Sequence, residues 1–381
     1  MKGNYLEAEK LIDCLKAVIN QQKIPQNDVA LDWELFYKTA DYHHVSNMIY
    51  YAVLGMRPAL PQEWVSRFSA RYRKAVISEE QYSNLVEAVL WDCEQRGIHI
   101  MALDSWIYRR FYPIPEMRLT DKAEFRVEAK KKAEIDRMMY RLDFIPETDS
   151  VSGGYSYTRS GLRLVFYEKM EYGSRKMTRY FGIPVKLLPR VQEREYVHRM
   201  EEPDLFVFLM CNKAQRFTEG EFDLRDMIDI WLYYRAIVRG SGWNGIIKRL
   251  TGLRVWKFVN YMIALAQVWF GGGIPGEEQP LLEELEKYIL NKGTQGQEAA
   301  KRILPLLKHT LRRKKKLHKK ETRKKWHRWM FPEQEYMRFI YPRMGKYRIL
   351  LPVCWLRRLG RSLFAYGRMK FKNRGNSENA S

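Results

Sequence analysis

The segment from residue 97 to residue 127 constrains the fold of this chain more than any other part of it. Its first residues include Ile98, Ile100 and Leu103, and they form an apolar run of the length typical of a buried strand. A second short run extends over residues 122–127, after a stretch rich in aromatic residues and proline. Two strands this close together indicate a β-sheet in the middle of the chain.

The regions on either side of this sheet have the periodicity of helices. Apolar residues recur at helical spacing through most of residues 1–96, and again from about residue 202 to about residue 290. Between residues 98 and 185, short strand-like runs alternate with turns, and one helix is expected near residues 128–141. The sequence therefore predicts an α+β protein (mixed α/β), in which a small mixed sheet is flanked by N- and C-terminal helical regions.

These patterns divide the chain into four predicted parts. At 381 residues, with 46% hydrophobic and 14% aromatic content, the chain is long enough and apolar enough to fold around a buried core. The predicted parts are an N-terminal helical region at 1–96, an α/β core at 97–190, a second helical region at 191–300 and a C-terminal extension at 301–381.

Three features of the sequence predict a cytoplasmic protein without a membrane-spanning segment. The chain has no continuous apolar run near the roughly 20 residues that a transmembrane helix needs. Residues 1–10 are polar and lack the apolar centre of a secretory signal. The four cysteines stand singly and far apart, which argues against a zinc site or a disulfide framework and suits a reducing compartment.

The positive charge of the chain is concentrated at its C-terminal end. The formal net charge is +22, but residues 1–300 hold 42 Lys and Arg against 41 Asp and Glu, whereas residues 301–381 hold 25 against 4. Such an extension can neutralise nucleic-acid phosphates, bind an anionic membrane surface, or simply pack on the core. The clustering of Trp, Leu and Arg favours the membrane surface, which would place the protein peripherally at the inner face of the membrane.

Two motifs in the chain match the pattern of a known family. The first motif fits the form YP.P..R..gD.D, and its residues are Tyr112, Pro113, Pro115, Arg118 and Asp121. The second motif, at residues 225–231, reads RDMIDIW and fits a helical pattern R.llDiy. With these motifs the chain resembles the uncharacterised nucleotidyltransferase family of the polymerase-β superfamily, from about residue 41 to about residue 358.

The resemblance implies a polymerase-β-like core that transfers a nucleoside monophosphate from a nucleoside triphosphate to an acceptor, with Mg²⁺. Such enzymes hold divalent ions through carboxylates aimed into one cleft. Of the paired aspartates, Asp121 is present, and Ala123 stands at the second position. Since side chains two apart on a strand share a face, we expect Asp121 to share its face with Ala123, and Glu124 to point the other way unless a bulge re-aims it. The predicted metal ligands are Asp121 and Glu124.

The resemblance also implies a third carboxylate on a later strand, within residues 162–170. One alignment puts the acid position at Phe166, and a shift by two residues puts it at Glu168; the sequence does not choose between them. The predicted catalytic residues are Asp121 and Glu168. A later helical pattern H..KH reads Asn212, Gln215 and Arg216 in this chain.

Three residues are predicted to contact the nucleotide: Ser105, Arg118 and Arg159. Ser105 stands in place of a glycine in a phosphate-binding turn, which reduces the freedom of the backbone there. Asp104 stands in place of a lysine, which puts negative charge where a triphosphate needs positive charge. Arg118 is expected either to bind phosphate or to hold a carboxylate.

The substitutions near the expected chemistry leave two functions open. The first is a nucleotidyltransferase with weak or lost activity, which binds a nucleoside triphosphate and uses Mg²⁺ if it is active. The second is a catalytically inert scaffold, without a cofactor, that binds an anionic membrane surface or nucleic acid through residues 301–381. In either case Arg225 and Asp226, on an amphipathic helix, are expected to form a structural ion pair.

Overall fold

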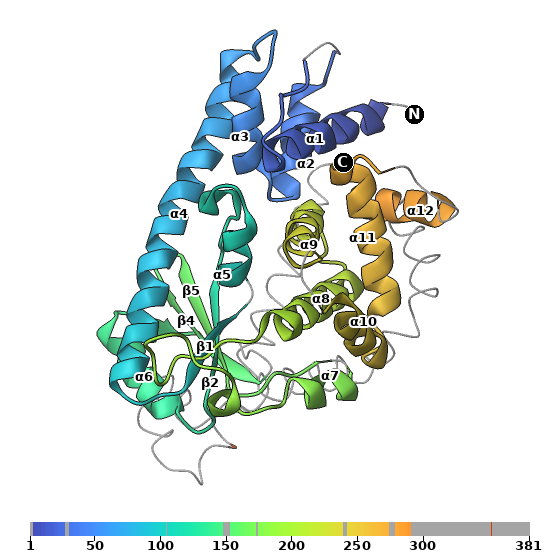
Figure 1. Cartoon of the computed structure of the whole chain (residues 1–381). Coiled ribbons are helices and arrows are strands. Elements are labelled where there is room, and N and C mark those ends of the chain that lie inside the picture. The colour runs from blue at the N-terminus through green and yellow to red at the C-terminus, as the bar shows by residue number, and fades with distance from the viewer. Residues whose placement is uncertain are drawn as a thin grey trace. The chain divides into compact units, whose positions relative to one another are not determined.

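A computed structural model describes residues 3–26, 30–103, 105–147, 153–172, 174–238, 242–273 and 279–290, together with Pro352 (Figure 1). Apart from Pro352, these residues belong to one compact unit, Met1–Arg312. The predictions of a membrane-binding or nucleic-acid-binding tail lie outside the described residues. Within the described ranges, no helix is both long enough and apolar enough to cross a membrane.

The N-terminal part of this unit is helical, as its periodicity predicts. Its helices are α1 (Gly3–Ile19), α2 (Trp33–Tyr42), α3 (Ser46–Gly55) and α4 (Gln62–Gln95). Helix α2 begins after Asp32, whose Oδ1 accepts a hydrogen bond of 3.0 Å from the backbone N–H of Leu35. Helix α4 has 34 residues, so it is long enough to contact both α3 and the sheet (Figure 1).

The central sheet has five strands in the order β1-β2-β5-β4-β3. They are β1 (Ile100–Leu103), β2 (Ala123–Val127), β3 (Ile145–Pro146), β4 (Gly154–Arg159) and β5 (Leu162–Tyr167). Strand β2 pairs with β5 in parallel, and every other pair of neighbours is antiparallel. The predicted α+β class, with a small mixed sheet between helical regions, is confirmed.

Short helices connect the strands and set the position of Asp121. They are α5 (Ser105–Tyr108), η1 (Arg109–Phe111), η2 (Pro115–Met117), α6 (Lys132–Arg141), α7 (Arg175–Tyr180) and η3 (Val185–Leu187). Strand β2 begins at Ala123, so Asp121 and Lys122 precede it in a bend and are not part of the strand. This difference from the predicted strand at residues 122–127 decides the geometry of the cleft described below.

The two faces of the sheet have different surroundings. One face carries Ala123, Phe125 and Phe166, which are buried in a core with residues of α4 and α6. The rings of Phe125 and Phe166 stack with their centroids 5.1 Å apart. Because side chains alternate along a strand, Glu124 belongs to the second face of the sheet. Tyr167 belongs to the same face.

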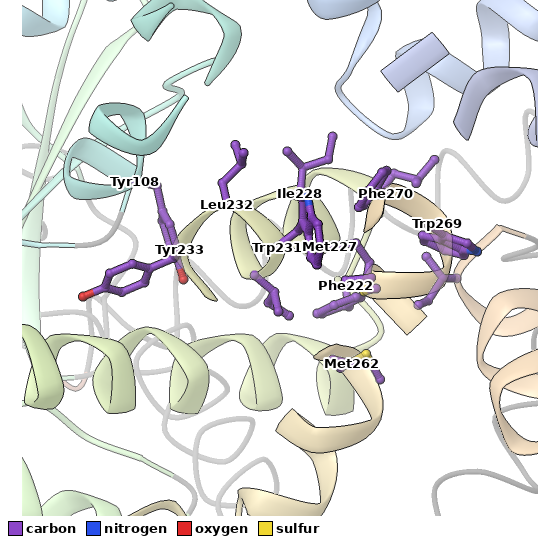
Figure 2. Close-up of a cluster of buried hydrophobic side chains, with 14 of the residues drawn as sticks. Tyr108, Phe222, Met227, Ile228, Trp231, Leu232, Tyr233, Met262, Trp269 and Phe270 are labelled. Carbon is purple, nitrogen blue, oxygen red and sulfur yellow. The ribbon is translucent and has the colours of Figure 1, made fainter. Parts of the chain in front are cut away.

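The C-terminal helices share a core with the N-terminal ones. They are α8 (Glu202–Glu219), α9 (Leu224–Ile237), α10 (Trp243–Gly252), α11 (Trp256–Gly271) and α12 (Gln279–Leu290). Helix α9 is buried over its first ten residues, and Figure 2 shows its side chains Met227, Ile228 and Trp231 beside Phe222 and Phe270. A helix buried on all sides needs partners for its charged residues, and those partners form the network described in the next section.

Two histidines join β1 to the segment that precedes α8. Nδ1 of His198 lies 2.8 Å from the carbonyl of Leu188, which only accepts, so this nitrogen carries the proton. In the tautomer with the proton on Nδ1, Nε2 of His198 accepts the hydrogen bond that Nδ1 of His99, 2.8 Å away, donates. Burial and the neighbouring His198 hold the pKa of His99 below its ordinary value of 6.5.

We expect the stability of the protein to fall with acidification through this pair. The unfolded chain takes up a proton at His99 more readily than the folded one, so the stabilising effect is complete above pH 6.5 and declines as pH falls below that value. The substitution His99→Asn keeps a donor toward His198 but removes the titrating group. Urea unfolding between pH 7.5 and pH 5 should show a shallower loss of stability in this variant, and an unchanged slope would contradict the assignment.

Candidate active site

A cleft of about 240 Å³ lies between the second face of the sheet and helices α8 and α9. Leu103, Glu124 and Tyr167 line it from the strands, and Phe208 lines it from α8. Six positions of the family motifs line it as well: Arg118, Asp121, Asn212, Gln215, Arg216 and Arg225. Segments that are about a hundred residues apart in the sequence therefore meet at one site.

The loop that carries Asp121 is held by side chains of helix α4. The hydroxyl of Ser78 donates to the carbonyl of Thr120 at 2.9 Å, and the hydroxyl of Tyr82 donates to the carbonyl of Asp121 at 2.8 Å. The Tyr82 hydroxyl also accepts a hydrogen bond of 3.0 Å from the backbone N–H of Arg163, at the start of β5. The position of Asp121 relative to the sheet is thus set by one buried tyrosine.

Positive charges surround the carboxyl group of Asp121. Although the residue is partly exposed, crowding by the surrounding protein would by itself raise the pKa of this carboxyl. The guanidinium groups of Arg225 and Arg118 and the ammonium group of Lys122 outweigh this effect. The pKa of Asp121 is therefore below its ordinary value, and the group is a carboxylate at neutral pH.

Glu124 lines the same cleft as Asp121. Its Oε1 accepts hydrogen bonds from the ammonium group of Lys122 at 2.7 Å and from the hydroxyl of Tyr167 at 2.9 Å. The expectation that Glu124 points away from the cleft was wrong. Strand alternation does not relate the two residues, because Asp121 lies in the bend before β2.

Ala123 lies away from this cleft. It is 1% exposed and packs in the apolar core between the sheet and helices α4 and α6. The expectation that Ala123 shares a face with Asp121 was therefore also wrong, for the same reason. In this fold the two motif-region carboxylates that line the cleft, Asp121 and Glu124, are separated by three positions and not by two. Glu171, Glu219, Glu221 and Asp226 line it as well.

The structure does not bring the other predicted acid, Glu168, into the cleft. Glu168 follows β5, and its Oε1 accepts a hydrogen bond of 3.2 Å from the backbone N–H of Lys130. The alternative position, Phe166, is fully buried in the apolar core. Neither position considered for the third carboxylate, Phe166 or Glu168, therefore places an acid in the cleft.

Two residues predicted to contact the nucleotide also lie elsewhere or are not described. Arg159, the last residue of β4, donates to the carbonyl of Leu142 at 2.6 Å and lies over the ring of Phe144, 4.7 Å from its centroid. It is absent from the lining of the cleft. Helix α5 begins at Ser105, whose side chain is outside the described residues.

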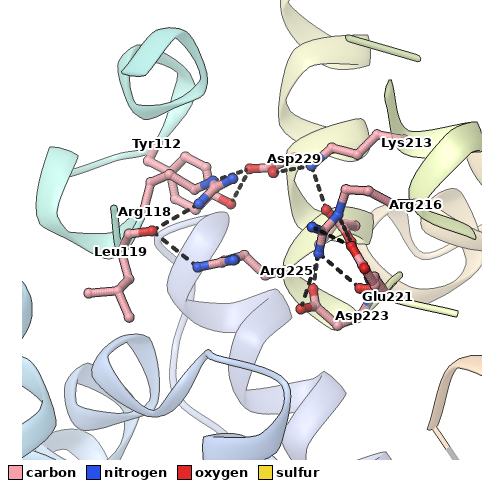
Figure 3. Close-up of polar contacts among 10 residues, drawn as sticks. Tyr112, Arg118, Leu119, Lys213, Arg216, Glu221, Asp223, Arg225 and Asp229 are labelled. Carbon is pink, nitrogen blue, oxygen red and sulfur yellow. Dashed lines mark hydrogen bonds and ion pairs between the residues drawn. The ribbon is translucent and has the colours of Figure 1, made fainter. Parts of the chain in front are cut away.

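Arg118 holds a carboxylate, as one of its two predicted roles requires. Its Nε donates to Oδ1 of Asp229 at 2.8 Å, and the hydroxyl of Tyr112 donates to the same oxygen at 2.7 Å (Figure 3). Arg118 is 4% exposed and Asp229 is fully buried. The two sequence motifs are thus joined in one buried network, which connects the Asp121 loop to helix α9.

Arg225 and Asp226 take part in this structural network, and each contacts a residue of another segment. Nη1 of Arg225 donates to the carbonyl of Leu119 at 3.1 Å, so helix α9 also holds the Asp121 loop. Asp226 accepts a hydrogen bond of 3.1 Å from Nε of Arg216 and closes a capping box with Asp223 at the start of α9.

Lys213 is a member of the network that the sequence analysis missed. It is 2% exposed, and its ammonium group donates to Asp226 and to Asp229, at 2.6 Å in both cases (Figure 3). The ammonium group also lies 4.4 Å from the centroid of the Tyr108 ring. The signal in the sequence was a single lysine within the apolar stretch of α8, since a buried cation requires buried acids nearby.

The comparison of the sequence with protein families agrees with this geometry. The profile of a family described as uncharacterised nucleotidyltransferase matches residues 30–271. The chain belongs to this family. The match covers helices α2 to α11, the sheet and the network around Asp229, and both motif regions at the cleft lie inside it.

Among solved structures, the chain is similar to the antibiotic-resistance factor ANT(2'')-Ia. The sequence identity is 11% and the TM-score is 0.35, over 46% of this chain and 92% of that chain. A search of curated proteins found no match.

The oxygen atoms of Asp121 and Glu124 are of the type that Mg²⁺ prefers. Among the described residues, no group of three or more His, Cys, Asp or Glu side chains is placed to hold a metal ion. A divalent ion in this family member would therefore depend on these two carboxylates together with oxygen atoms from substrate phosphates and water. Glu171, Glu219, Glu221 and Asp226 also line the cleft, but among the described residues they do not form a metal-binding group with Asp121 and Glu124.

Proposed function

We propose that the cleft binds a nucleoside triphosphate with Mg²⁺ and that the protein transfers the nucleoside monophosphate slowly to an acceptor. The observation that carries the proposal is the presence of Asp121 and Glu124 in one cleft of a nucleotidyltransferase-family chain. In this proposal the ion, when bound, balances the charge on the phosphate oxygens. Asp121 and Glu124 would be its ligands.

The basic residues of the cleft support the binding of phosphates. Arg225 and Lys122 lie close enough to lower the pKa of Asp121, so they also attract the anionic phosphates of a substrate bound beside it. Arg216 lines the cleft from α8. We propose that Arg225 and Lys122 orient the triphosphate, while Arg118 acts indirectly, by holding the loop in place.

The same cleft supports slow transfer. Glu124 already accepts a hydrogen bond of 2.7 Å from Lys122, so an incoming metal ion must displace that ammonium group. Neither candidate for the third carboxylate reaches the cleft, since Glu168 binds the Lys130 backbone and Phe166 is in the core. Both features reduce the stabilisation of the transferred phosphate relative to a site with a full set of carboxylates.

The pairing of Lys122 with Glu124 also favours the second function, an inert scaffold. In that alternative the ammonium group permanently takes the place of the metal ion, and residues 301–381 supply the binding surface for an anionic membrane or a nucleic acid. The full chain would then bind such a partner in a strongly salt-dependent way, and deletion of residues 301–381 would abolish this binding.

Calorimetric titration distinguishes the two proposals. ATP, CTP, GTP and UTP are titrated into the full chain with Mg²⁺ or Mn²⁺, and into the variant Asp121→Asn. We expect metal-dependent binding of at least one nucleotide, weakened about ten-fold or more in the variant, because a metal-bridging carboxylate is worth at least one charge-assisted contact. The absence of binding by either folded protein would establish the inert alternative.

A second variant tests the role given to Lys122. Removing this ammonium group with Lys122→Gln frees Glu124, so the affinity for Mn²⁺ in the absence of nucleotide should rise several-fold. The matched control is Lys132→Gln, which removes a lysine that forms an ion pair of the same length, 2.7 Å, with Asp136 outside the cleft. Equal Mn²⁺ affinities in both variants would count against a metal site at Glu124.

A further inference from the structure

A second hollow, of about 550 Å³, lies between helices α7 and α10. It shares no lining residue with the cleft around Asp121. The side chains and backbone that line it belong to Arg175, Lys176, Arg179, Tyr180, Arg249, Gly252 and Leu253. Four of these seven residues are cationic and none is acidic, which is unusual for the surface of a part of the chain whose charges balance.

The cations of this hollow are only partly neutralised. Arg249 pairs with Asp204 on α8, whose Oδ1 lies 3.2 Å from its Nη1. The same carboxylate also accepts a hydrogen bond from the hydroxyl of Tyr180. Within the described residues, neither Arg175 nor Arg179 has an ion pair, and both are exposed.

The sequence explains how so much positive charge collects there. Residues 172–192 contain five Lys and Arg and no Asp or Glu, and residues 230–276 contain six Lys and Arg and no Asp or Glu. In contrast, residues 1–300 as a whole contain 42 basic and 41 acidic residues. The two acid-free segments meet at this hollow, where Nζ of Lys176 donates to the carbonyl of Gly252 at 3.3 Å.

The arrangement of the arginines defines the kind of ligand. Arg175 and Arg179 are four residues apart on α7, so their side chains leave the same side of the helix. Guanidinium groups bind phosphate oxygens through paired hydrogen bonds, and clustered cations favour a group with two negative charges. A hollow of this volume accommodates a small phosphorylated molecule or the headgroup of a phospholipid.

We propose that the hollow between α7 and α10 is a binding site for a phosphomonoester or pyrophosphate group, held by Arg175, Arg179 and Arg249. The site is separate from the proposed nucleotide cleft, and it contributes binding without chemistry. Asp204 keeps Arg249 in position and accepts a hydrogen bond from Tyr180, while Arg175 and Arg179 supply positive charge that has no ion pair within the described ranges.

The test uses the full chain in the presence of EDTA, which removes metal-dependent binding in the cleft. Inorganic pyrophosphate is titrated into wild type, into the double variant Arg175→Gln with Arg179→Gln, and into a control double variant, Arg137→Gln with Arg141→Gln. The control removes two arginines with the same spacing from helix α6, so it changes the net charge equally. We expect binding to weaken about ten-fold or more in the α7 variant and less than about two-fold in the control.

Vesicles distinguish a lipid headgroup from a soluble phosphate as the natural source. Co-sedimentation with phosphatidylcholine vesicles is measured with and without phosphatidic acid, whose headgroup is a phosphomonoester. A loss of phosphatidic-acid-dependent binding in the α7 variant alone assigns the site to a lipid, whereas a loss of pyrophosphate binding alone assigns it to a soluble ligand. Equal behaviour of the α7 variant and the α6 control with both probes would overturn the proposal. A single-stranded oligonucleotide serves as a third probe, and a loss of binding in the α7 variant to this probe alone would also overturn it.

The outcome is independent of the proposed nucleotidyl transfer. Both arginines are exposed, so their replacement by glutamine should leave the urea midpoint nearly unchanged, and this is measured first. The variant Asp121→Asn should retain pyrophosphate binding in the presence of EDTA, because none of the residues that line the hollow also lines the cleft. The failure of one proposal therefore leaves the other standing.

Discussion

Replacing Ala123 by aspartate, which restores the aspartate pair of the family motif, is expected to destabilise the protein by about 3–5 kcal/mol and not to create a metal site. Ala123 is 1% exposed and packs in the apolar core formed with α4 and α6. The side chains of this core are apolar, so a carboxylate there must either lose its charge or open the core. Urea unfolding of wild type and variant measures the effect.

Two further measurements separate the causes of this loss. Ala123→Asn has nearly the same shape as the aspartate variant but no charge, so it should retain more stability at neutral pH. Acidification should reduce the difference between the two variants, since a buried aspartate is tolerated best when protonated. A folded Ala123→Asp variant with tighter Mn²⁺ binding would show that position 123 faces the cleft, contrary to the structure.

Replacing Asp229 by alanine should also remove about 3–5 kcal/mol of stability. Asp229 is fully buried and accepts hydrogen bonds from Tyr112, Arg118 and Lys213 at 2.6–2.8 Å. Burial alone would raise the pKa of its carboxyl, but Arg118 and Lys213 lower it, so the group is ionised in the fold. The substitution removes the carboxylate that the buried guanidinium group of Arg118 and the ammonium group of Lys213 share.

A double-mutant cycle tests this explanation. The double variant Arg118→Met with Asp229→Leu removes both members of the pair, while Lys213 keeps Asp226 as a partner. We expect the double variant to lose clearly less stability than the sum of the single variants Arg118→Met and Asp229→Leu, because each single change leaves one buried member of the pair without the other. Additive losses would show that the pair itself is not coupled. The Asp121 loop should also loosen, so nucleotide binding should weaken with the single variants.

Much of the fold follows from local patterns in the sequence. The N-terminal helices appear where apolar residues recur at helical spacing, and the strands appear where short apolar runs lie between turns. These predictions succeed because periodicity depends on neighbouring residues only. Their errors are at boundaries: the second strand begins at Ala123, one residue later than predicted, and the helix expected near residue 128 begins at Lys132.

A shift of one residue at a strand end had large consequences for the site. Strand alternation, applied from Asp121 onward, predicts the reverse of the directions that Ala123 and Glu124 take in the structure. The bend at Asp121 is stabilised by hydrogen bonds from Ser78 and Tyr82, on a helix some forty residues earlier. No pattern within the motif itself reports such contacts.

The sequence by itself determined the family, the succession of helices and strands, the motif from Tyr112 to Asp121 and the uneven distribution of charge. These properties depend on residue types and on short spacings. Tertiary structure alone decided that Arg118 pairs with Asp229, that Lys213 completes their network, and that two acid-free segments form one basic hollow. Such contacts join residues far apart in the chain, and packing of the helices against the sheet, not spacing, brings them together.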